Sequence, residues 1–177
     1  MSGEIVGISG SPGVNSRSRI VVSELVRRLA QRTGLDGQFI DLNDFAADAL
    51  LGRRRDTHVD ETIAAVSRAR IVVVGTPVYR ASYAGQLKAF FDLFPQSALR
   101  GVSVGLVATG AGNAHALVID HALRPLVASL AGVSASSGIY ITDGQFPDKS
   151  NIPVEVTEKI DELANELVIL AQRKDAA

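Results

Sequence analysis

The strongest constraint on the fold comes from four consecutive β-branched residues, Ile71-Val72-Val73-Val74, which end at Gly75. An unbroken apolar run of this kind is typical of a strand that is buried on both faces of a parallel sheet. Parallel strands need long crossover connections, and these connections place helices over both faces. The run therefore predicts an α/β fold.

Strand-like and helix-like segments alternate along the rest of the chain. Four more strands are expected at residues 5–8, 38–42, 101–108 and 137–141. Helices are expected from the first loop to about Arg32, and at residues 60–68, 84–94, 115–130 and 154–172. Residues 43–57 are expected to form a long connection with one helical turn. This rhythm predicts a single domain over residues 1–177, with a flavodoxin-like, doubly wound sheet of five parallel strands in the order 2-1-3-4-5.

In a sheet of this order, ligands bind outside the carboxyl ends of the strands, between strands 1 and 3. The loops after strands 1, 3 and 4 cover residues 9–18, 76–83 and 108–115. All three loops contain Gly, Ser, Thr or Tyr residues, and all three are expected at the same edge of the sheet. The sequence therefore predicts a binding site at that edge.

The first loop has the features of a phosphate site. Four hydroxyl groups and one guanidinium stand there, on Ser9, Ser11, Ser16, Ser18 and Arg17. The backbone N–H groups that open the following helix have no intrahelical partner, and the helix dipole adds partial positive charge. Gly10 and Gly13 are expected to let the backbone approach a ligand. The plainer alternative is a helix cap at Ser16 with turn-forming glycines.

The loop favours a terminal phosphate monoester, such as that of FMN, over other phosphates. A Walker A loop needs a lysine, and the first lysine of the chain is Lys88. The dinucleotide fingerprint GxGxxG is also absent, because the glycines stand at Gly7, Gly10 and Gly13.

The other two loops offer a wall for a planar ring. Pro77, Val78 and Tyr79 form an apolar and rigid stretch whose backbone groups can bond to the polar edge of a ring. Thr109 and Gly110 provide a second stretch of backbone that can approach the ring. For Tyr79, simple coverage of the sheet end stays open as an alternative.

Composition excludes several functions. The net charge of −1, from 18 basic and 19 acidic residues, gives no electrostatic basis for nucleic-acid binding. Because the chain has no cysteine, it has no disulfide or thiolate metal site, and its 3 dispersed histidines predict no metal site either. No apolar run approaches the roughly 20 residues that span a bilayer, and no signal peptide is recognised. We therefore expect no membrane association and a cytoplasmic location.

Several separated motifs together resemble the NAD(P)H-dependent FMN reductase family. They are Gly7-x-Ser9-Gly10-Ser11-Pro12, Ser16-Arg17-Ser18 and Gly75-Thr76-Pro77-Val78-Tyr79-x-Ala81-Ser82-Tyr83-x-Gly85-x-Leu87-Lys88-x-Phe90-x-Asp92. Similarity to the branch that serves two-component alkanesulfonate monooxygenases lies in Leu99-Arg100-Gly101, Ala108-Thr109-Gly110 and Ala122-Leu123-Arg124-Pro125-Leu126. The resemblance covers about residues 4–143.

The resemblance implies an enzyme that uses FMN with NADPH or NADH and supplies reduced FMN to a flavin-dependent monooxygenase. It implies phosphate contacts at Ser9, Ser11, Ser16, Arg17 and Ser18, and a flavin-ring environment at Pro77, Val78, Tyr79 and Gly110. Lys88 and Asp92 match a pair of the family motif, which can be a structural ion pair or a chemical pair. Because hydride passes directly from a nicotinamide to a flavin, no catalytic acid or base is expected.

Pro125 predicts an irregularity in the helix at residues 115–130. Proline has no N–H, so the carbonyl of His121 loses its helical partner and a π-bulge is favoured. In the family that the chain resembles, the corresponding helix carries an inserted residue in a π-helix, at a subunit interface beside the flavin. His121 is the candidate for that residue, and a histidine on a polar helix face is the alternative.

Other functions stay open at this point. The alternative enzyme is a quinone, azo or chromate reductase that retains its FMN. The alternative outside enzymes is an electron-transfer flavodoxin, and the balanced charge disfavours it because flavodoxins dock through acidic surfaces. A regulator without flavin is the third alternative.

Two segments predict contacts at the surface. The helix at residues 84–94 is apolar nearly all round, which predicts a second subunit over it and hence a homodimer or homotetramer. The run Arg53-Arg54-Arg55 is interpreted as a solvated face or an interface partner, with a contact to the extra phosphate of NADPH as the alternative.

Overall fold

The computed structural model describes residues 4–174 and has the predicted α/β architecture. Four parallel strands form the body of the sheet, in the order β2 (Gly37–Asp41), β1 (Ile5–Ser9), β3 (Ile71–Tyr79) and β5 (Ser103–Gly110). Two short strands share the fifth position and pair with opposite ends of β5, namely β6 (Val133–Ser134) and β7 (Ile139–Thr142). The predicted order 2-1-3-4-5 is confirmed, with the fifth strand in two pieces.

Side chains hold the chain where the fifth strand is broken. Glu166 accepts hydrogen bonds from the backbone N–H groups of Ser136 and Ser137, at 2.5 and 2.9 Å. Arg124 donates to the carbonyl oxygens of Ala135 and Ser136. These bonds satisfy backbone groups that have left the β ladder.

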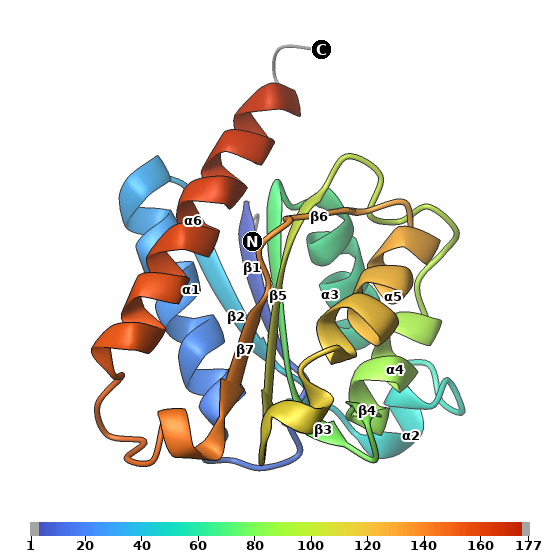
Figure 1. Ribbon diagram of the computed structural model, residues 1–177. Helices are drawn as coiled ribbons and strands as arrows, with labels where there is room; N and C mark the ends of the chain where they lie inside the picture. The colour runs from blue at the N-terminus through green and yellow to red at the C-terminus, as the bar shows by residue number, and fades with distance from the viewer. Residues whose placement is uncertain (1–3, 175–177) are drawn as a thin grey trace.

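Helices cover both faces of the sheet (Figure 1). One face carries α1 (Arg17–Thr33) and α6 (Val154–Lys174). The other carries α3 (Thr57–Arg68), α4 (Gly85–Asp92) and α5 (Arg124–Ser129). Shorter turns are η1 (Leu42–Asp44), α2 (Ala47–Leu50), η2 (Asn113–His115) and η4 (Asp143–Gln145).

The central strand β3 contributes to two hydrophobic cores. Ile71 and Val73 pack in the core under α1 and α6, while Val72 and Val74 pack in the core under α4 and α5. All four side chains are at most 1% exposed. The prediction of a strand buried on both faces is confirmed.

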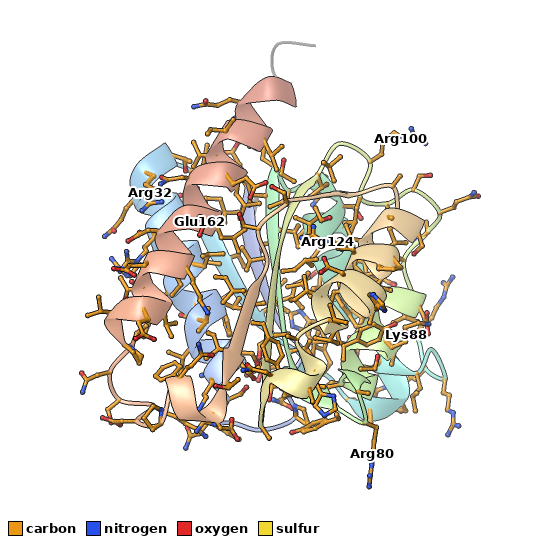
Figure 2. The ribbon with its side chains drawn as sticks, viewed as in Figure 1. Arg32, Arg80, Lys88, Arg100, Arg124 and Glu162 are labelled. Atoms are coloured by element: carbon orange, nitrogen blue, oxygen red, sulfur yellow. The ribbon has the colours of Figure 1, made fainter. Side chains whose placement is uncertain are left out.

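The segment after Gly75 is a strand and hairpin, whereas a loop was expected over residues 76–83. β3 continues to Tyr79 and turns back into β4 (Ser82–Tyr83), with which it pairs antiparallel. The two turn residues, Arg80 and Ala81, have φ angles of 50° and 63°. A two-residue hairpin turn with both φ angles positive matches the right-handed twist of the flanking strands. Arg80 extends from the hairpin tip into solvent (Figure 2).

The helix expected at residues 115–130 is replaced by three shorter pieces. The 3-10 turn η2 comes first, then the π-helical turn η3 (Ile119–Leu123), then α5. The backbone N–H of Arg124 bonds to the carbonyl of Ile119, five residues earlier. The predicted local bulge beside Pro125 is confirmed.

The argument for a second subunit from helix α4 is wrong. Of the five large apolar side chains on which it rests, Leu93 is half-buried and the other four are buried within the chain itself: Leu87, Phe90, Phe91 and Phe94. Leu50, from the connection after β2, belongs to the same core, and the half-buried Phe45 packs against it. A segment distant in sequence therefore covers the part of α4 that the sheet leaves open.

None of the helices in the described part of the chain has the length and apolar content needed to cross a bilayer.

Candidate functional site

A cleft of about 370 Å³ lies where β1, β3 and β5 end, at the lower edge of the sheet in Figure 1. Each of the three predicted loops contributes to its lining, and so does the segment after β7. The lining residues are Ser11, Gly13, Asn15, Ser16, Arg17, Pro77, Val78, Tyr79, Thr109, Gly110, Ala111, Asp143 and Lys149. The structure therefore brings the predicted loops together at the switch point of the sheet.

No side chain of the described residues caps the first turn of α1. Ser16 occupies the N-cap position, but its side chain accepts no capping hydrogen bond among the described residues. Its hydroxyl instead pairs with that of Ser18, with the two oxygens 2.8 Å apart. No acidic residue stands in the first turn. The alternative in which the Ser16 side chain caps the helix is therefore wrong. N–H groups at the start of the helix remain available for hydrogen bonds to a ligand.

Ser9 carries a buried hydroxyl without a partner. The residue is 0% exposed, and its Oγ has no hydrogen-bond partner among the described residues. Ser9 lies on the same face of β1 as Gly7, whose α-carbon faces Val22 and Val26 of α1. A buried, unpaired hydroxyl costs about 1–3 kcal/mol, so it needs an explanation. A phosphate seated at the start of α1 fits both this hydroxyl and the open helix end.

Arg17 is paired within the protein. Its Nη1 lies 2.9 Å from Oδ1 of Asp143, and its Nε donates to the backbone carbonyl of Phe146. The guanidinium has five N–H donors, so some of them remain for a ligand. Its charge is nevertheless partly balanced by Asp143, which also lines the cleft.

Two sets of hydrogen bonds fix the end of the cleft that is lined by β3 and β5. The hydroxyl of Thr76 accepts from the N–H of Ala84 at 3.0 Å and donates to the carbonyl of Pro77 at 2.9 Å, which holds the base of the hairpin. The hydroxyl of Tyr140 donates to the carbonyl of Gly112 at 2.7 Å. Burial raises the pKa of the Tyr140 phenol, and the nearby carboxylate of Asp143 raises it further. The phenol is therefore a donor at neutral pH.

Two glycines are required by packing. A Cβ on Gly110 would lie 2.3 Å from the Tyr140 hydroxyl oxygen. A Cβ on Gly10 would lie 2.8 Å from Cβ of Leu87 on α4. The expectation that Gly10 makes room for a ligand is therefore wrong, since it makes room for α4. Gly13 has space around it, with Oγ of Ser11 at 3.6 Å.

Sequence reasoning missed four residues of this region. Asn15, Asp143 and Lys149 line the cleft, and Tyr140 supports it. Asp143 and Lys149 follow the last strand, and a parallel strand ends at the same edge as its neighbours. That topological signal was present in the sequence.

Other singled-out residues lie away from the cleft. His121 is exposed in the π-helical turn and does not line the cleft. Arg53, Arg54 and Arg55 are exposed, and Arg54 pairs with Asp48 and Asp56, which agrees with a solvated face. Nζ of Lys88 lies 2.5 Å from Oδ1 of Asp92, so this pair is an exposed ion pair on α4. Ser9 and Ser18 are buried and are not among the lining residues, although the Ser18 hydroxyl pairs with that of Ser16, which lines the cleft.

A doubly wound parallel sheet with a hydroxyl-lined cleft at its switch point is the architecture of flavodoxin-like proteins. Comparison with known proteins gives the particular family. Residues 4–146 match the family described as NADPH-dependent FMN reductase. The chain belongs to this family, and it is an NAD(P)H-dependent oxidoreductase of FMN.

Individual relatives agree with this assignment. The NADH-dependent FMN reductase SfnF of Pseudomonas fluorescens (strain Pf0-1) is 34% identical over 148 residues, which are 82% of this chain and 79% of the relative. An FMN reductase (NADPH) of Pseudomonas putida is 35% identical over 160 residues, covering 89% and 81%. The apo crystal structure of an NADH:FMN oxidoreductase, EMOB, matches with a TM-score of 0.83 at 32% identity, over 96% of this chain and 88% of that one. An archaeal flavodoxin, with a TM-score of 0.62 at 9% identity, shares the fold alone.

Proposed function

We propose that this reductase releases reduced FMN to a partner, a flavin-dependent monooxygenase that cleaves sulfonates. Support comes from the motifs shared with reductases that serve alkanesulfonate monooxygenases and from the relatives, which are named as reductases of FMN. The nicotinamide donor is NADPH or NADH.

In this proposal the cleft holds FMN by its two ends. Hydroxyls and N–H groups at the start of α1 hold the phosphate, and the hairpin and the end of β5 hold the ring. The phosphate residues are Ser9, Ser11, Ser16, Arg17 and Ser18, and the ring residues are Pro77, Val78, Tyr79, Thr109 and Gly110. The orphaned hydroxyl of Ser9 supports the phosphate end, because an anion would satisfy it.

The protein's contribution is orientation. When bound, FMN accepts hydride from the nicotinamide, and the hard chemistry belongs to these two cofactors. The side chains of the cleft bind and orient the reactants and keep their reacting atoms close. No side chain is assigned a proton transfer.

The exposure of Tyr79 is the observation that supports release of reduced FMN. Tyr79, on the ring side of the cleft, is 50% exposed. A cleft whose aromatic wall is half open within one chain leaves one side of a bound ring accessible. Such a site suits a flavin that serves as an exchangeable substrate better than one that is sealed in.

Turnover with different acceptors tests the proposal. The purified protein is given NADPH or NADH with an excess of free FMN, and separately with quinones and azo dyes. We expect saturable reduction of free FMN and transfer of the product to an added FMNH₂-dependent monooxygenase. Saturable quinone reduction with negligible turnover of free FMN contradicts release and favours a reductase that retains its flavin.

We also propose that the protein forms a homodimer or homotetramer and works in the cytoplasm, where both nicotinamides are available. Exposed apolar side chains support self-association: Leu51 is 56% exposed and Leu117, beside the π-helical turn, is 62% exposed. The π-helical turn with His121 is proposed to lie at that interface. Light scattering coupled to gel filtration tests this point, and a strict monomer contradicts it.

A further inference from the structure

Lys149 contacts the loop between β1 and α1, which is called the phosphate loop below, although the two are far apart in sequence. It lies in the segment that joins β7 to α6, just beyond residues 4–146 that match the family. Its Nζ donates to the backbone carbonyl of Asn15, 134 residues earlier. Both residues line the cleft, next to Ser16. An ammonium group therefore stands beside the open start of α1.

The charge of Lys149 is unbalanced. No carboxylate oxygen of the described residues lies within 4.0 Å of its Nζ. Arg17 differs, because its Nη1 lies 2.9 Å from Asp143. An ammonium has three N–H donors, and the carbonyl of Asn15 takes one of them. Two cationic side chains line this cleft, and Lys149 is the one whose charge has no carboxylate partner in the described part of the chain and whose N–H donors are mostly available for a ligand.

We propose that Lys149 is a specificity-determining residue that recognises the phosphate dianion and so selects FMN over riboflavin. This inference rests on the proposed binding of FMN in the cleft. A phosphate monoester carries close to two negative charges at neutral pH. Helix N–H groups and serine hydroxyls supply hydrogen bonds but no full charge, and the guanidinium of Arg17 is shared with Asp143. Lys149 supplies the missing positive charge.

The contact to Asn15 has a second consequence. It holds the segment after β7 against the phosphate loop, so a substitution that breaks the contact also moves the loop. Lys149→Gln separates the two effects, because the glutamine amide keeps an N–H donor but loses the charge. Lys149→Arg keeps the charge and the donors.

Flavin fluorescence titration tests the inference with FMN and riboflavin as the two ligands. The matched control is Lys159→Gln, which removes the same charge from α6. Lys159 does not line the cleft, and its Nζ lies 3.4 Å from the carbonyl oxygen of Tyr140. We expect Lys149→Gln to raise the Kd for FMN about tenfold, because the contact to the phosphate loses the positive charge of its donor. The Kd for riboflavin should change less than about twofold, and Lys149→Arg and Lys159→Gln should match the wild type. The FMN affinity of Lys149→Gln should also fall less with added salt.

The possible outcomes distinguish a failure of the role of Lys149 from a failure of FMN binding in the cleft. Equal effects of Lys149→Gln on FMN and riboflavin, or no effect on FMN, overturn the role of Lys149 while leaving the cleft intact. A wild-type protein that binds neither flavin overturns the proposed binding of FMN itself. Preferential loss of FMN in Lys159→Gln assigns the effect to net charge and also overturns the role of Lys149.

Discussion

The hydroxyl of Tyr140 donates a hydrogen bond to the carbonyl oxygen of Gly112, with the two oxygens 2.7 Å apart. The same hydroxyl fills the space beside Gly110, where a Cβ would lie 2.3 Å from its oxygen. One phenol on β7 therefore supports the loop after β5, at Gly112, and excludes a side chain at Gly110, the last residue of β5.

This relationship predicts a non-additive pair of substitutions. Tyr140→Phe should lower the free energy of unfolding by about 1 kcal/mol, since one hydrogen bond is lost. Gly110→Ala should cost more, about 1–3 kcal/mol, because of overpacking. In the double variant the nearest atom to the new Cβ is ring carbon Cζ at 3.3 Å, so part of the cost should be recovered. Urea denaturation measures all three, and strictly additive costs contradict the packing argument.

Asp143 is predicted to weaken FMN binding. Its carboxylate pairs with Arg17 and places a negative charge in the cleft. Asp143→Asn should free the guanidinium and lower the Kd for FMN about two- to fivefold at low salt, in line with the strength of exposed ion pairs. Riboflavin binding should not change. Asp92→Asn on α4 removes an equal charge outside the cleft and serves as the control. Weaker FMN binding in Asp143→Asn would show that the ion pair positions Arg17 for the phosphate.

Ser9→Ala should have opposite effects on stability and on binding. The buried hydroxyl has no partner among the described residues, so its removal should raise the free energy of unfolding of the flavin-free protein by about 1 kcal/mol. The same change should raise the Kd for FMN severalfold because a phosphate donor is lost. Ser67→Ala, which removes a hydroxyl bonded to the carbonyl of Ile63 on α3, should leave FMN binding unchanged. A less stable Ser9→Ala protein with normal FMN binding would contradict the assignment.

Ionisation of Glu166 should make the free energy of unfolding depend on pH. Burial opposes its ionisation, but hydrogen bonds from Ser136 and Ser137 outweigh that effect and lower its pKa from 4.5 to about 2. A carboxylate with a depressed folded pKa stabilises the fold above its unfolded pKa, and this contribution is lost as the pH falls from about 5 toward 2. We expect about 1–2 kcal/mol at pH 7, after allowance for solvent screening.

Urea midpoints of Glu166→Gln and wild type at pH 7 and pH 3 measure this contribution. The gap between the two proteins should shrink by more than half at pH 3. Glu162→Gln, an exposed position on the same helix (Figure 2), should show no such gap. A gap that does not change with pH contradicts the role of the ionised carboxylate.

The sheet could be predicted because local pattern and topology agree. The β-branched run at Ile71–Val74 must be buried on both faces, and the alternation of elements then leaves few possible strand orders. The hairpin was missed because Pro77 argues against a strand. In the structure Pro77 extends β3 opposite Thr109 of β5, near the carboxyl end of both strands. Proline near a strand end is tolerated where few ladder bonds are lost.

The candidate site was only partly predictable. Motifs next to the strands pointed to Ser16 and Tyr79, whereas Asp143 and Lys149 belong to no motif and were indicated only by their place after the last strand. Only tertiary structure pairs Asp143 with Arg17. The covering of α4 by Phe45 was likewise hidden, since that contact joins elements far apart in sequence.

A crystal structure of the protein with FMN tests the central claim most directly. We predict the phosphate at the first turn of α1, within hydrogen-bond distance of Ser9, Ser16 and Lys149, and the ring between Tyr79 and Gly110. FMN bound elsewhere, or a cleft filled by the protein's own side chains at saturating FMN, would contradict the account.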